Sequence, residues 1–272
     1  MNAETNDAFS ADWLALREPA DNAARNSDVR QAFANYLSSA EDELRLIDMG
    51  CGTGSTVRAL APFLSAALPG VSQRWLLCDA DALLLSMARE QTNDLDVAIT
   101  FTTVDLASQD AVNDLIGEFE PDVVTGSALI DLVSADWLDR MLAHAVADGF
   151  GLYFALNYSG EERWLPAHPL DAAILAAFNR DQRRDKGFGH ALGGEAAGYL
   201  AKRARERGLA ATIGPSDWDL GQDEVALRTM LAEGIANAAV AGGAGEGEAA
   251  KWLDDRRRSE QAVVGHFDIF VG

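Results

Sequence analysis

Residues 44–54 read LRLIDMGCGTG, and this stretch decides the fold. It begins as an apolar run of strand length and ends in three glycines, Gly50, Gly52 and Gly54, which allow a sharp turn and a close approach of the backbone to a ligand. The next residues, TVRALAPFLSAAL, repeat apolar positions at helical spacing. A helix that starts at such a turn presents free N–H groups to the ligand. A strand, a glycine turn and a helix in this order therefore predict a site for a nucleotide-like molecule.

The rest of the chain repeats the alternation of strands and helices. Five apolar runs have the length of strands: 44–49, 75–78, 97–104, 122–125 and 152–156. Helical patterns lie between them, which is typical of β-α units and a parallel sheet. Further along, a helix is expected at 195–207, a strand at 210–213 and a helix at 223–241. A flexible link, AGGAGEGEA, a charged helix and a last strand at 262–271 follow. The fold class predicted is a doubly wound α/β sheet.

Two segments lie outside this alternation. Residues 11–38 predict one or two amphipathic helices, with a break near Pro19 and Asp21 as a helix N-cap. Residues 157–192 read as irregular, and an irregular stretch of that length suggests a functional loop or cap. We therefore expect an N-terminal helical segment over 1–40 and one domain over 41–272, with a cap insertion at about 157–192.

Two classes of ligand compete for the glycine turn, and spacing separates them. The dinucleotide fingerprint needs glycine at its first, third and sixth positions, but the sixth position counted from Gly50 is Ser55. Asp48, just before the turn, would also repel a pyrophosphate. Its carboxylate suits a cationic methionine moiety instead. A dinucleotide-dependent oxidoreductase is thereby disfavoured.

The stretch DMGCGTGS resembles motif I of the class I S-adenosylmethionine-dependent methyltransferases. The resemblance extends over roughly residues 40–156, and more weakly to GHFDIFVG, which is similar to the family's antiparallel last strand. It implies a mostly parallel seven-stranded sheet, S-adenosylmethionine as cofactor and S-adenosylhomocysteine as product. We take the chain as a methyltransferase with a small-molecule acceptor, and a cofactor-binding partner subunit without turnover or a protein or tRNA methyltransferase as alternatives.

The resemblance also implies roles for individual side chains at the cofactor. Asp79 matches the acid that binds the ribose hydroxyls, and Asp105 matches the polar residue near the adenine amino group. Either aspartate would also serve as a helix cap. Arg17 is a candidate to bind the carboxylate of the methionine moiety; the alternative is that it is a surface arginine. The expected cofactor-binding set is Asp48, Gly50, Cys51, Gly52, Gly54, Asp79, Ala80, Asp105, Leu106, Ser127 and Arg17.

The acceptor site is less defined, because methyl transfer demands no fixed catalytic constellation. Asn157, Tyr158 and Phe188 are the candidates for substrate contact, with Trp164 and Lys186 nearby in the cap. His168 and His190 are the histidines placed where a general base is plausible. The loop 126–129 lacks the Asn/Asp-Pro-Pro-aromatic signature of exocyclic-amine methylation of nucleic acids.

Composition excludes several other classes of protein. The formal net charge of −21 disfavours a nucleic-acid partner. No apolar run approaches the roughly 20 residues of a membrane helix, and the start is polar, so we expect a cytoplasmic protein. The four histidines are scattered and no metal is expected. The two cysteines, Cys51 and Cys78, make no disulfide framework, and the oligomeric state and the acceptor atom stay open.

Overall fold

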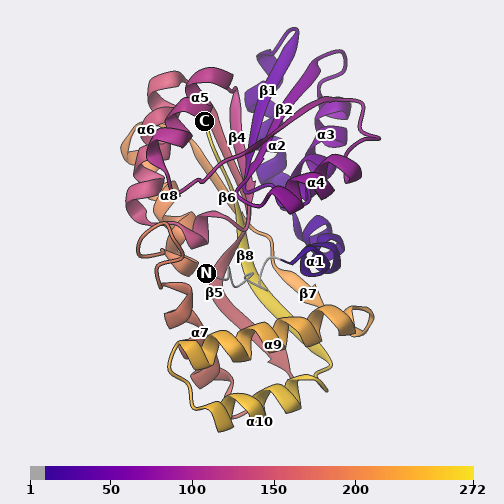
Figure 1. Ribbon diagram of the computed structural model, residues 1–272, viewed down its shortest axis with the longest axis vertical. Helices are drawn as coiled ribbons and strands as arrows, with labels where there is room; N and C mark the ends of the chain where they lie inside the picture. The colour runs from indigo at the N-terminus through magenta and orange to yellow at the C-terminus, as the bar shows by residue number, and fades with distance from the viewer. Residues whose placement is uncertain (1–9) are drawn as a thin grey trace.

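The computed structural model describes residues 10–272 and is built on one mixed sheet (Figure 1). The strand order is β3-β2-β1-β4-β5-β8-β6, and β7 pairs with β8 at the side of this path. Pairs among β1 to β5 are parallel, whereas β8 runs antiparallel to β5, β6 and β7. The strands are β1 (Glu43–Met49), β2 (Ser72–Asp79), β3 (Ala98–Thr103), β4 (Val123–Ser127), β5 (Gly151–Leu165), β6 (Ala211–Pro215), β7 (Trp218–Leu220) and β8 (Gln261–Val271). The doubly wound sheet with an antiparallel last strand is confirmed, and β7 is an additional short strand.

Helices cover both faces of the sheet, as strands with two apolar faces require. One face is packed by α2 (Ser27–Tyr36), α3 (Ser55–Ala67) and α4 (Ala82–Gln91). The other face is packed by α5 (Gln109–Phe119), α6 (Ala135–Asp148) and α8 (Ala196–Glu206). The carboxyl ends of β1 to β4 face the cap and the N-terminal helix, which are described next. Ligands bind at these ends of the strands in sheets of this kind.

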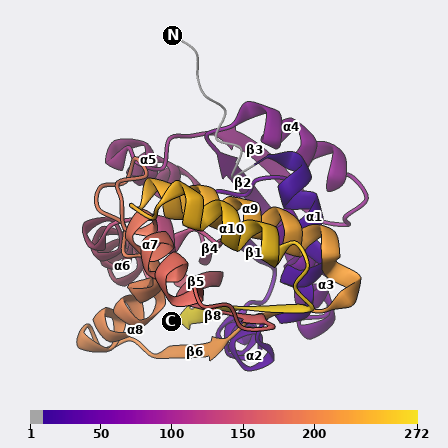
Figure 2. The ribbon, with the colours of Figure 1, turned by 90° about the horizontal axis from the view of Figure 1, so that it is seen from below.

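A cap with its own core extends from one end of the sheet (Figures 1 and 2). It consists of the far halves of β5 and β8, with β7, α7 (Asp171–Gln182), α9 (Val225–Ala241) and α10 (Glu246–Arg256). The prediction of an irregular stretch at 157–192 is wrong in part, because β5 runs on to Leu165 and α7 follows. Strand β5 extends this far because it pairs with β8 across two register shifts, and residues 216–262 supply the rest of the cap.

The N-terminal segment forms α1 (Ala11–Ala24) and α2, with a short 3-10 turn over Leu37–Ser39; residues 1–9 of the expected 1–40 segment lie outside the described part. Pro19 lies inside α1, and the break falls at Arg25 and Asn26 instead. Asn26 caps α2 through its side chain. The N-cap role expected of Asp21 is wrong: Asp21 is buried, and its carboxylate accepts a hydrogen bond from the indole of Trp218 at 3.0 Å.

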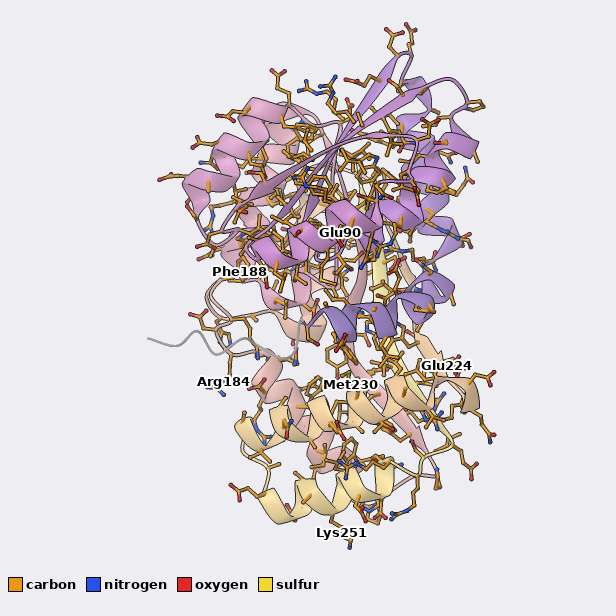
Figure 3. The ribbon with its side chains drawn as sticks, turned by 45° about the vertical axis from the view of Figure 1, so that its right-hand side comes forward. Glu90, Arg184, Phe188, Glu224, Met230 and Lys251 are labelled. Carbon is orange, nitrogen blue, oxygen red and sulfur yellow. The ribbon has the colours of Figure 1, made fainter. Side chains whose placement is uncertain are left out.

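The junction between α1 and α2 is fixed to the sheet by one buried carboxylate. Asp268 of β8 accepts hydrogen bonds from the backbone N–H of Asn26 at 2.9 Å and from that of Leu156 at 2.8 Å. Leu156 is the residue at which β5 bends toward the cap, at a register shift with β8. Helix α1 therefore ends next to a fixed point, and it lies between the sheet and the cap, where it contacts β7 and α9 (Figure 3).

Candidate functional site

The glycine turn and the acid of β2 converge, as the sequence predicts. Gly50, Gly52 and Gly54 have φ of 65°, 53° and 84°, which side chains rarely adopt. The turn is held against β2 by two hydrogen bonds, from Cys51 N to Cys78 O at 3.0 Å and from Gly52 N to the Asp79 carboxylate at 2.8 Å. The ends of β1 and β2 thus form one surface.

Asp79 is not the N-cap of α4. Asp81 takes that role, and its carboxylate accepts hydrogen bonds from the backbone N–H groups of Leu83 and Leu84. The Asp79 carboxylate accepts from Gly52 and Asp81 and stays partly exposed. A carboxylate has about four acceptor positions, so it retains capacity for two hydroxyl groups.

The end of β3 lies beside Asp79, because the Val104 N–H donates to the Asp79 carbonyl at 2.9 Å. Asp105 is exposed, and its carboxylate accepts from the N–H of Ala107, while Ser108 caps α5. Leu106 is buried, and its carbonyl accepts the indole N–H of Trp137 at 2.8 Å. Ala80 is exposed next to Asp79. Ala80, Asp105 and Leu106 therefore border the turn on one side.

Two opposite charges are buried on the other side of the turn. Asp48 is 0% exposed and Arg25 is 5% exposed. Oδ2 of Asp48 and both Nε and Nη1 of Arg25 have no hydrogen-bond partner among the described residues. Burial raises the pKa of Asp48 to about 7, although a hydrogen bond from Thr125 and the charge of Arg25 oppose this shift. Unpaired buried polar atoms of both signs at a turn are unusual in a folded protein.

Ser127 links these groups to the first turn of α3. Its hydroxyl accepts a hydrogen bond from Arg25 Nη2 at 3.1 Å and lies 3.0 Å from the hydroxyl of Thr56. The sequence reasoning missed Arg25, which the structure places at this site through a contact with a residue 102 positions away. Arg17, the arginine proposed from the sequence, is already paired, because it donates two hydrogen bonds to Asp21 and lies over the ring of Trp218.

Helix α1 covers the turn. A Cβ on Gly52 would lie 3.0 Å from Leu14 Cδ1, so the leucine rests directly on the glycine. Glu18 forms a two-pronged ion pair with Arg58 of α3 at 2.8 and 2.6 Å. Both side chains are about one-fifth exposed, and solvent screening limits such a pair to about 1 kcal/mol. Helix α1 therefore lies over the turn through Leu14 and is held to α3 by this ion pair.

The expected acceptor residues separate into two groups. Asn157 and Tyr158 lie on β5 directly after the bend and are buried; Asn157 donates to the carbonyl of Phe267 at 2.9 Å. Phe188, labelled in Figure 3, instead packs edge-on against Trp137. With the exposed His190 it lines a surface cavity of about 530 Å³.

The remaining cap candidates serve the cap itself. The ring nitrogens of His168 contact Asp255 of α10 at 3.0 Å and the backbone N–H of Leu170 at 3.1 Å. Lys186 donates to Asp181 at 2.8 Å, and Trp164 is buried in the core of the cap. The structure does not bring His168 or His190 to the glycine turn. A role of either as the general base gains no support from these contacts.

Two strained residues lie just after the end of β4 and at the bend within β5. Ala128 and Leu156 have φ of 51° and 56°, and the N–H of Ala128 donates to the carbonyl of Ala155 at 2.9 Å. Each such conformation costs on the order of 1–3 kcal/mol and is concentrated at functional sites. The strain therefore lies where β4 and β5 leave the sheet, between the turn and the cap.

Other kinds of site receive no support within residues 10–272. No group of three or more histidines, cysteines or acids is placed to hold a metal. Cys51 and Cys78 are both free and buried, and burial raises the pKa of each thiol, so neither is a ready nucleophile. None of the helices in this part of the chain has the length and apolar character needed to cross a membrane.

Comparison with known proteins points to one fold. No family model and no curated protein matches the sequence. Among solved structures, a cyclopropane-fatty-acyl-phospholipid synthase-like protein from Lactobacillus casei ATCC 334 is 14% identical over 97% of this chain and 94% of its own, with a TM-score of 0.54. The cyclopropane synthase MmaA2 from Mycobacterium tuberculosis is 11% identical over 96% and 94% of the two chains, with a TM-score of 0.49. The strand order and the first of these likenesses show that the chain has the fold of the class I S-adenosylmethionine-dependent methyltransferases.

Proposed function

We propose that the protein is an S-adenosylmethionine-dependent methyltransferase that acts on a small-molecule acceptor. One observation carries the proposal: the buried carboxylate of Asp48 and the buried guanidinium of Arg25 lie at the glycine turn with polar atoms unpaired. An amino-acid zwitterion supplies an ammonium for the first and a carboxylate for the second. A dinucleotide supplies no ammonium for Asp48.

The other residues of the turn fit the adenosyl part of the same cofactor. Asp79 has acceptor capacity for the ribose hydroxyls, with Ala80, Asp105 and Leu106 beside it toward the adenine. When bound, S-adenosylmethionine supplies an electrophilic sulfonium methyl group. The protein then has to position the acceptor in line with the C–S bond and exclude water, and α1 closes the turn for this purpose.

Calorimetric binding of S-adenosylhomocysteine tests the proposal, with 5′-methylthioadenosine as a probe that lacks the amino-acid part. We expect Asp79→Asn to weaken both ligands by about 10-fold or more, because a hydrogen-bonded charge is removed. Arg25→Ala should weaken S-adenosylhomocysteine by a similar factor and leave 5′-methylthioadenosine unchanged. Asp94→Asn, which alters an exposed acid after α4, is the control.

Three results would contradict the proposal. The first is no binding of S-adenosylhomocysteine to the wild type, and the second is tighter binding of NADH. The third is an Arg25→Ala variant that loses both ligands equally while keeping the circular dichroism spectrum of the wild type. A protein that binds the cofactor but never transfers a methyl group would match the partner-subunit alternative.

A further inference from the structure

Five aromatic side chains form a continuous row between α1 and the cap. Ring centroids are 6.2 Å apart for Trp13 and Trp218, 5.0 Å for Trp218 and His266, 6.3 Å for His266 and Tyr158, and 5.4 Å for Tyr158 and Phe178. The five rings come from five different elements, α1, β7, β8, β5 and α7. The row thus marks the junction at which the N-terminal helix, the sheet and the cap meet.

Several buried oxygens around this row have no hydrogen-bond partner among residues 10–272, and two of them carry the argument. They are the hydroxyl of Tyr158 and Oδ1 of Asp131, which lies in the 3-10 turn after β4 (Ile130–Leu132). Burial raises the pKa of Tyr158, and the charges of Glu162, Asp131 and Glu161 raise it further. The hydroxyl therefore lies within the field of these carboxylates. Folded proteins rarely leave two such groups without a partner.

His266 contributes an acceptor nitrogen to the same junction. Its Nδ1 lies 3.0 Å from the carbonyl of Val264, so Nδ1 carries the proton and Nε2 is left as an acceptor. Burial and the charge of Arg17 lower the pKa of this histidine to about 3, which keeps the ring neutral. Asp131 Oδ1 and His266 Nε2 can therefore both accept a hydrogen bond from a ligand.

The charges around the junction favour a ligand that carries positive charge. Burial raises the pKa of Asp131 to about 6, and the charge of Arg17 opposes this shift. The guanidinium of Arg17 is already paired with Asp21 through two hydrogen bonds. The carboxylates of Asp131, Glu161 and Glu162 all act on the phenol of the row. Aromatic faces add attraction for an organic cation. An amine meets these demands, whereas a carboxylate or phosphate does not.

The junction adjoins the proposed cofactor crevice through three segments. Strand β4 ends at Ser127 in the crevice, and Asp131 follows in the junction four positions later. Strand β5 bends at Leu156 and presents Tyr158 two positions on. Helix α1 places Leu14 on the glycine turn and Arg17 over the aromatic row.

We propose that Asp131, Tyr158 and His266 bind the acceptor, that this acceptor is a primary or secondary amine, and that Asp131 receives its proton. This inference rests on the proposed function. The bound ammonium first gives a proton to the Asp131 carboxylate, which frees the lone pair of the nitrogen. The lone pair then forms a bond to the methyl carbon as the C–S bond breaks and leaves its electron pair on sulfur. The methylated amine leaves as an ammonium, and Asp131 returns its proton to solvent.

The test supplies methyl-labelled S-adenosylmethionine with three pools of compounds on matched aliphatic and arylalkyl skeletons: primary and secondary amines, alcohols and phenols, and carboxylic acids. We expect label in the amine pool alone. Asp131→Asn should lower the rate by about 100-fold or more, the usual size of general-base catalysis, and remove the rise of rate with pH that is expected of the wild type. Calorimetric binding of S-adenosylhomocysteine should change by less than about 2-fold. Asp114→Asn, an exposed acid on α5, should behave as the wild type.

Tyr158→Phe keeps the ring in the row and removes the unpaired hydroxyl, so it provides a second variant if Asp131→Asn does not fold. It should raise KM for the amine by about 10-fold, the value of a hydrogen bond to a charged group, with a smaller change in kcat. Label in either of the other pools, no label in any pool while S-adenosylhomocysteine binds, or an unchanged KM for Tyr158→Phe would overturn the inference. Absence of S-adenosylhomocysteine binding would instead overturn the proposed function.

Discussion

Replacing Asp48 with asparagine should stabilise the protein at high pH while it removes a group that the proposed cofactor needs. The carboxyl is fully buried, and burial raises its pKa from the ordinary 3.8 to about 7. An acid whose pKa rises on folding lowers the free energy of unfolding at any pH where the carboxyl is ionised in the unfolded chain. This loss of stability is absent below pH 3.8 and grows as the pH rises toward 7. Asparagine carries no charge, and its Oδ1 can still accept the hydrogen bond that Thr125 donates at 2.9 Å.

The size of the effect follows from the shift. A rise of about three pKa units corresponds to about 4 kcal/mol once the folded carboxyl is ionised, of which about 2 kcal/mol develops between pH 5.5 and 8.5. Urea unfolding of the wild type and of Asp48→Asn at these two pH values measures it. The variant should gain about 2 kcal/mol relative to the wild type on going from pH 5.5 to 8.5, and Asp94→Asn should gain nothing.

The same variant should bind S-adenosylhomocysteine more weakly, by about 10-fold or more, because the ammonium loses its charged partner. Stability and ligand affinity would thus move in opposite directions. A difference in the free energy of unfolding that is equal at both pH values would refute the reasoning about burial. Unchanged affinity would refute the assignment of Asp48 to the ammonium.

Three further predictions follow from contacts elsewhere in the chain. Glu18→Gln removes the ion pair with Arg58 and should speed association of S-adenosylhomocysteine by about 5-fold in stopped-flow fluorescence; an unchanged rate would show that α1 does not limit entry. Gly242→Ala places a Cβ 2.0 Å from a carbonyl of α7 and should cost about 2 kcal/mol or more in thermal unfolding, whereas Gly234→Ala, with open space around it, should be neutral or stabilising. Burial lowers the pKa of His266 from 6.5 to about 3, so the folded state loses stability as the pH falls below 6.5. Between pH 7 and 5 the free energy of unfolding of the wild type should fall by about 2 kcal/mol more than that of His266→Gln. Equal losses in the two proteins would contradict this.

The sequence predicts those parts of the fold whose signals are local. The glycine turn, the acid at the end of β2 and the alternation of strands and helices each depend on residues close together in the chain. Asp81 also caps its helix as a local signal indicates. The cap is different, because the polar second half of β5 becomes a strand only through pairing with β8, about 100 residues later.

Long-range partners also explain which site residues the sequence reveals. Asp21 looks like a helix cap in the sequence, but its indole partner lies 197 positions away. Arg25 follows a helix and carries no motif, and its role appears only where it meets Ser127 of β4. The orphaned oxygens of Asp131 and Tyr158 are a property of packing, which periodicity and spacing do not encode.

The attachment of Asp268 to Asn26 and Leu156 has a consequence for the timing of turnover. Because Asn26, two residues after the end of α1, is anchored, any opening of α1 would pivot about this end and would uncover the cofactor crevice and the aromatic row together. Loading of the two proposed ligands would then be a shared event, and so would release of the two products.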